Sequence, residues 1–395
     1  MHFFPISAPT VALSLSDEGL CLVEIKKHWR KSSLRHIARL PLSPGSLTLS
    51  STKPNIANFD EVLAQLKALA KPYRRPISIA LSLPDICART SIFDFASFPT
   101  KKPEQTALVN WRFQQDLKLD TSQARLAFGL YVPTSVRDSL SPDTTEHVRV
   151  LGTAIRHEII EQYENICLEA DLIPTSVGMS GLDVFDLYRP NIQDRLTAEN
   201  SSWTSHPPTF LFLFISHWGF TFLAFQDGSP RFIRTKALAI KTEAHDLQVP
   251  SLDPESEKHG ETRDYRPTSS GDPSSDAHHD CATGNTPYPS YTAMKVEKEI
   301  LATLQYYFEM FPPSPATASC PVNLFLTTDL TLGQSLMPPH DHIQQTLKAS
   351  GGHEPQIRVT SLSPTAHFHL LHTHLALSSH QEEAALPGYA SLMVA

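Results

Sequence analysis

Glycine is scarce in this sequence: the 395 residues include 15 glycines against 32 prolines. Loops made of several glycines, which bring backbone N–H groups close to phosphates, therefore have few places to form. The five cysteines are an odd number and include no Cys-x-x-Cys pair. The sequence accordingly predicts neither a disulfide framework nor a zinc knuckle, and a reducing cytoplasm is the expected compartment.

An excess of basic charge and long apolar runs are also missing. The chain has 33 basic and 41 acidic residues, for a net charge of -8, which argues against a dedicated nucleic-acid binder. No apolar stretch reaches the ~18–20 uncharged residues of a membrane span, and residues 1–15 lack the pattern of a secretory signal. With 41% hydrophobic and 19% charged residues, the balance is that of a globular protein.

The first half of the chain begins with a predicted meander of strands. Three strands are expected at Thr10–Ser16, Leu20–Lys27 and Arg35–Leu42, because apolar residues recur there between polar turns. An amphipathic helix follows at Asn58–Ala70, with the asparagine as its cap. The strand Pro76–Leu83 is too apolar for a sheet edge, so we expect it at the centre of a sheet.

A different order, strand–helix–strand–strand, interrupts this framework at about residues 88–155 and predicts a small inserted module. Its elements are expected at Arg89–Phe95, Pro103–Leu117, Arg125–Pro133 and His147–Ile155. The framework then resumes with a helix at Arg156–Asp171, a strand at Pro174–Ser180 and a helix at Gly181–Tyr188. We therefore expect a first domain over residues 1–188, followed by a polar, proline-containing linker over residues 189–208.

The second half, residues 209–395, repeats the opening order and predicts a second domain of the same kind. A polar run over residues 243–290 has few large apolar side chains, and we expect it to be a disordered insertion. The remaining elements are predicted as strands Thr209–Ser216, Gly219–Gln226, Arg231–Leu238, Pro321–Thr327 and Gln356–Thr360, and helices Thr292–Phe311, His340–Ala349 and Thr365–Ser378. Such duplication indicates two α/β domains that face each other.

The duplicated order with its insertion resembles the actin-like ATPase superfamily, whose fold is of the ribonuclease H type, and within it the FtsA and PilM branch. Four short stretches carry the resemblance: VALSLSDEGLCLVEI at 11–25, LSLPD and RTSIFDF within 80–95, FLAFQDGSPRFIR at 222–234 and EKEILATLQYY at 297–307. The local similarity is greatest to PilM proteins of type IV pilus assembly. Together these stretches span most of the chain outside residues 243–290.

The nucleotide motifs of the superfamily are altered here. Two Asp-x-Gly hairpins are expected to hold magnesium and approach the phosphates, but the first reads Ser14 and Ser16 at these positions, and the second reads Phe214 and Ser216. The adenosine-side Thr-Gly-Gly motif reads 327–329, Thr-Thr-Asp. We therefore assign no catalytic, cofactor-binding or metal-binding residues and expect a pseudo-ATPase. In the alternative hypothesis Asp17 and Glu18 accept metal-bound water.

The resemblance implies a cytoplasmic scaffold, bound to the inner membrane through protein partners. A PilN-like membrane protein would supply a cytoplasmic tail as the ligand, and pilus motor ATPases and self-association are further implied contacts. Two alternatives stay open: an active ATPase that binds ATP and magnesium through altered motifs, and an FtsA-like filament former at the membrane. The ending LPGYASLMVA lacks the basic amphipathic helix that the latter requires.

Other candidate sites have more ordinary interpretations. Histidines cluster in residues 367–374 and beside an aspartate and a cysteine in residues 278–281, but neither group has a convincing set of ligands, so we expect polar surface residues. Trp111 lies on the helix of the inserted module, where we expect it in the core. The short basic groups 71–75 and 101–102 are interpreted as solvated loops.

Overall fold

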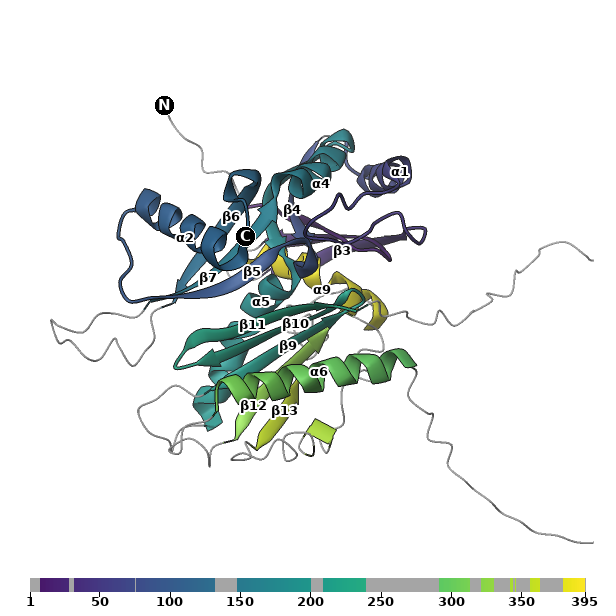
Figure 1. Ribbon diagram of the computed structural model, residues 1–395. Coiled ribbons are helices and arrows are strands. Elements are labelled where there is room, and N and C mark those ends of the chain that lie inside the picture. Colours follow the sequence, from purple (N-terminus) through teal and green to yellow (C-terminus); the bar gives the residue numbers. More distant parts are fainter. Residues whose placement is uncertain are drawn as a thin grey trace, which may run out of the picture.

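The computed structural model describes residues 8–27, 32–74, 76–131, 148–199, 209–238, 291–312, 321–329, 342–343, 345, 356–362 and 379–394. Two five-stranded mixed sheets and one three-stranded antiparallel sheet form the framework of these residues (Figure 1). We call the sheet of β1, β2, β3, β4 and β8 the first sheet and that of β9 to β13 the second sheet. The lobes built on them are the first and second lobe.

The first sheet has the strand order β3-β2-β1-β4-β8, and the second has β11-β10-β9-β12-β13. In each, a three-stranded antiparallel meander is extended by two strands that run parallel to its first strand. This confirms the predicted duplication and the central position of β4. The strands are β1 (Val11–Leu15), β2 (Gly19–Lys27), β3 (Ser32–Pro41), β4 (Ile77–Leu83), β8 (Leu172–Met179), β9 (Phe210–Ser216), β10 (Gly219–Gln226), β11 (Ser229–Ala237), β12 (Val322–Thr328) and β13 (Ile357–Ser361).

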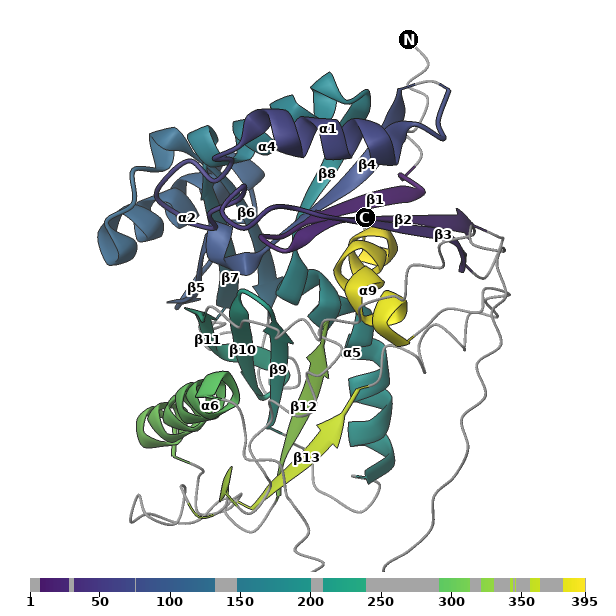
Figure 2. The same ribbon diagram turned by 90° about the vertical axis from the view of Figure 1, so that its right-hand side faces the viewer.

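Helices cover both faces of each sheet and produce a layered molecule (Figure 2). Helices α1 (Phe59–Ala70) and α4 (His157–Glu169) pack on the outer face of the first sheet, and α6 (Tyr291–Met310) packs on the outer face of the second. Between the sheets lie α5 (Ser180–Glu199) and α9 (Ser379–Val394), within one hydrophobic core that both lobes share. None of the described helices is long and apolar enough to cross a membrane.

The strand β9 shows how this layering follows from the sequence. All seven of its residues, FLFLFIS, are buried, because both faces of the second sheet are covered. Side chains alternate across a strand. Its phenylalanines, such as Phe214, therefore pack in the core between the lobes, whereas Leu211, Leu213 and Ile215 pack in the core beneath α6.

The insert consists of β5 (Arg89–Phe95), α2 (Lys102–Leu117), β6 (Ala124–Tyr131) and β7 (Val148–Arg156), with strand order β5-β7-β6. The predicted burial of Trp111 is wrong, because half of its surface is exposed. Helix α2 instead buries Val109 and Phe113, which lie one turn apart on the face toward the sheet. A residue two positions from Val109 is rotated by about 200° and points to the opposite side.

Two features of the helices differ from the predictions. Residues 189–199, expected within the linker, are helical: α5 continues through Pro190 to Glu199. Ile192 and Leu196 are buried in the core between the lobes, and this burial compensates for the backbone hydrogen bond that proline removes. Helix α9 was not predicted. It packs on β1, β2 and β4, with Gly388 close to Val23.

Several predictions lie outside the described residues. They are the insertion at 243–290, the helix at 365–378, most of the helix at 340–349, and both histidine groups. The assigned domain boundaries stay a prediction.

Candidate functional site

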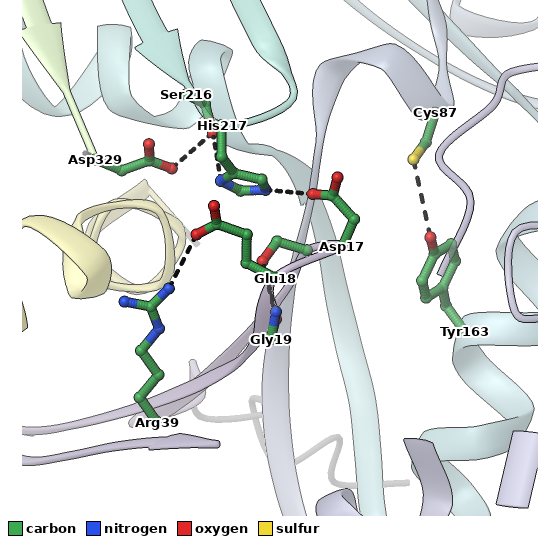
Figure 3. A network of polar contacts seen from close by, with 10 residues as sticks. Asp17, Glu18, Gly19, Arg39, Cys87, Tyr163, Ser216, His217 and Asp329 are labelled. Carbon is green, nitrogen blue, oxygen red and sulfur yellow. Dashed lines mark hydrogen bonds and ion pairs between the residues drawn. The ribbon is translucent and has the colours of Figure 1, made fainter. Parts of the chain in front are cut away.

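Two short hairpin turns, one from each lobe, meet at the candidate site (Figure 3). The β1–β2 turn supplies Asp17 and Glu18, and the β9–β10 turn supplies His217. The tightness of the second turn depends on Gly219, whose φ of 142° suits glycine. A Cβ atom there would lie 1.9 Å from the carbonyl oxygen of Lys236 on the neighbouring strand.

An ion pair spans the two turns. The Nε2 atom of His217 lies 2.9 Å from Oδ1 of Asp17, and the side chains are 9% and 43% exposed, respectively. Beside it, the guanidinium of Arg39 on β3 lies 3.3 Å from a carboxylate oxygen of Glu18. The first lobe therefore presents an acidic turn to a buried imidazole of the second lobe.

A second set of contacts holds the imidazole from within its own lobe. The Ser216 hydroxyl donates to Oδ2 of Asp329 at 2.8 Å, and its oxygen lies 3.2 Å from Nδ1 of His217. Asp329 directly follows β12, and its backbone N–H donates to Ile215. The carboxyl ends of β9 and β12 thus bring Ser216, His217 and Asp329 together.

Burial and charge act in opposite directions on the groups of this network. Burial alone lowers the pKa of His217, but its contact with Asp17 and the charges of Asp329, Asp17 and Glu18 outweigh burial and raise it. Burial likewise favours a higher pKa for Asp17, but the contact with His217 lowers it. For Asp329, burial dominates and raises the pKa to about 6, although His217 and Ser216 oppose this.

The network resembles a Ser–His–Asp set, but the geometry does not support nucleophilic catalysis. Ser216 is completely buried, and its proton is donated to Asp329 rather than to an imidazole nitrogen. An attacking hydroxyl needs both access to a substrate and a base that takes its proton. We therefore interpret the network as a structural contact that joins the β1–β2 turn, the β9–β10 turn and the end of β12.

The residues at the altered motif positions have local structural roles. Ser14 donates to the Cys21 carbonyl at 3.4 Å, and Ser16 donates to the Gly19 carbonyl across its own turn at 3.0 Å. Phe214 is completely buried in the core between the lobes. The structure thus places Ser216 and Asp329 in the interlobe network, and Ser14 and Phe214 in the sheets.

His217 and Arg39 were missed by sequence reasoning. The available signal was that His217 directly follows Ser216 within a predicted turn that has a counterpart at Asp17 and Glu18. Their contact depends on how the two lobes face each other, which no local pattern encodes.

Further polar contacts join the lobes away from the turns. The buried Asp85, in a 3-10 turn after β4, accepts hydrogen bonds from the Thr221 hydroxyl of β10 at 2.7 Å and from the Gly181 backbone at 2.8 Å. Arg149 of the insert donates to the Ser229 hydroxyl of β11 at 2.6 Å. The insert and both lobes therefore form one connected unit.

Comparisons with known proteins identify solved structures that have a similar architecture. No protein-family model matches the sequence, and no curated protein matches it. Among solved structures, a chain of the PilM–PilN type IV pilus biogenesis complex matches at 15% identity over 98% of this chain and 96% of that one, with a TM-score of 0.58.

Two further solved structures are more distant. A Bacteroides thetaiotaomicron protein with an actin-like ATPase fold and unknown function matches at 10% identity over 91% and 94% of the two chains, with a TM-score of 0.41. The cytoplasmic domain of EpsL, from the Vibrio cholerae type II secretion system, matches at 8% identity over 57% and 69%, with a TM-score of 0.31. This chain has the actin-like ATPase fold, as its sequence predicted.

Proposed function

We propose that this protein is a PilM-like scaffold of a type IV pilus or related secretion machine, and that it is a pseudo-ATPase. The observation that carries the proposal is the combination of an actin-like fold over nearly the whole chain with a site between the lobes whose residues are unsuited to nucleotide. The fold likeness extends over 98% of this chain. A fold alone does not determine function, so the site decides between scaffold and enzyme.

Magnesium and ATP do not fit the residues present. Magnesium binds through carboxylates and ordered water, and the second expected carboxylate position is the buried ring of Phe214, which has no oxygen. Ser216 is already bonded to Asp329. Among the described residues, no group of three His, Cys, Asp or Glu side chains is arranged to hold a metal ion.

A scaffold function requires a protein ligand rather than a substrate. By analogy with the PilM–PilN complex, the ligand is the cytoplasmic tail of a PilN-like inner-membrane protein, which would hold this protein at the membrane from the cytoplasmic side. Pilus motor ATPases and a second copy of the chain are further candidate partners. A short extended tail gains main-chain hydrogen bonds and buries few side chains, so micromolar affinity is expected.

Two titrations by calorimetry test the two parts of the proposal separately. A synthetic peptide with the sequence of the PilN-like tail from the same genome should bind, whereas a scrambled peptide of the same composition should not. Failure of the peptide to bind would refute the scaffold function. ATP with magnesium should give no binding heat, and magnesium-dependent ATP binding would instead support the active-ATPase alternative.

A further inference from the structure

The contact between Asp17 and His217 joins the lobes at the tips of their central hairpins. Each residue lies at the carboxyl end of the first strand of its sheet, β1 or β9. The Asp17 and His217 side chains bridge the turns, with Nε2 and Oδ1 2.9 Å apart. A relative movement of the lobes at this end would therefore separate them (Figure 3).

His217 is held in position on its own lobe. Its Nδ1 atom lies 3.2 Å from the Ser216 hydroxyl, which in turn is bonded to Asp329. The next residue, Trp218, is 4% exposed within the core between the lobes. The contact of Nδ1 with Ser216 orients the imidazole so that Nε2 points to the first lobe.

The charges around His217 favour its protonated form. Asp17 and Glu18 face it from the β1–β2 turn, and Asp329 faces it from the end of β12. Arg39 on β3 is paired with Glu18 and offsets one of these carboxylates. At a side-chain exposure of 9%, the imidazole is only weakly screened by water, so its charge strengthens the contact with Asp17.

We propose that Asp17 and His217 form a clasp that holds the two lobes closed without any bound ligand, and that the clasp weakens when the imidazole loses its proton. The raised pKa of His217 gives the direction: its contribution is complete below the ordinary value of 6.5 and is lost as pH rises through the raised value. At the acidic end, the contribution of Asp17 is lost as pH falls through its lowered pKa. This inference does not depend on which protein the scaffold binds.

Trp218 supplies an optical probe beside the clasp. In a variant with Trp29, Trp111 and Trp203 replaced by phenylalanine, only Trp218 emits. We expect its emission to be that of a buried indole at pH 6 and to shift to longer wavelength as pH rises through the titration of His217. The His217→Gln variant should show the shifted emission at pH 6 and at pH 9. The control variant His36→Gln, on the exposed part of β3, should behave like the parent.

A double-mutant cycle tests the same clasp without altering the tryptophans. At pH 6, Asp17→Asn and His217→Gln should each raise the unfolding equilibrium constant about tenfold, and the double variant should raise it by little more than either one. At pH 9 the coupling should nearly vanish. Additive effects at pH 6, a coupling that is equal at both pH values, or a pH-independent Trp218 emission would each overturn the clasp. ATP and peptide binding are not part of these readouts, so their failure is distinguishable.

Discussion

Replacing Asp85 by asparagine should remove a pH-dependent part of the protein's stability. Asp85 is 2% exposed and accepts hydrogen bonds from Thr221 and Gly181 through Oδ2, while Oδ1 has no hydrogen-bond partner among the described residues. Burial raises its pKa from 3.8 to about 6. An asparagine oxygen accepts the same two bonds but does not titrate.

The direction in which stability changes with pH follows from the raised pKa of Asp85. A carboxyl group with a raised pKa in the folded state contributes stability that is complete below pH 3.8 and is lost as pH rises through about 6. A shift of this size corresponds to about 3 kcal/mol between the two limits, as an order of magnitude. Relative to wild type, Asp85→Asn should therefore gain up to about 3 kcal/mol in free energy of unfolding when pH rises from 4 to 7.5.

Urea denaturation followed by circular dichroism at pH 4, 5, 6 and 7.5 measures this difference. Both chains carry Asp183→Asn in this comparison, because Asp183 is a second buried acid whose pKa is raised to about 7 by burial and, in addition, by the charge of Asp85. Asp194→Asn, an exchange of the same kind at an exposed position of α5, is the matched control and should not reproduce this gain. If wild type and Asp85→Asn change in parallel across this range, the carboxyl does not titrate as the burial argument requires.

Four further substitutions test the packing of the fold by the same denaturation assay. Gly219→Ala should lower the free energy of unfolding by about 2–4 kcal/mol, because it combines a strained φ with a collision with Lys236. Gly45→Ala, which has a positive φ but no atom within 4 Å, should cost only about 1–2 kcal/mol, and equal costs would refute the collision. Phe214→Ala should cost about 3–5 kcal/mol by opening a cavity between the lobes, so a neutral result would place this ring outside the core. Trp111→Ser should cost only about 1–2 kcal/mol because half of the indole is already exposed, and a loss as large as that of Phe214→Ala would restore the buried position that the sequence predicted.

Much of the framework could be predicted from local patterns. The polar turn at residues 17–19 and the Asp227–Gly228 turn separate strands whose apolar residues are evident in the sequence. The helix cap at Asn58 was also predictable, since its side chain accepts from the Glu61 backbone. These features depend on residues within one turn or strand of each other.

The misassigned elements depend on distant partners. Helix α5 passes through Pro190 because the core between the lobes buries its later turns, and α9 has no apolar stripe of its own because sheet and helix surround it. Trp111 and Phe113 are both large aromatic residues of α2, but they lie on opposite sides of the helix. Sequence periodicity did not show which of the two faces the insert's sheet.

The amino-acid sequence by itself determined the duplication, the insert and the loss of carboxylate and glycine at the altered motif positions, because each is written in residue type and order. Only the tertiary structure decided which contacts are made at this place. The contact of Asp17 with His217 joins residues two hundred positions apart, and their pairing exists because the shared core, α5 and α9 hold two separate sheets face to face.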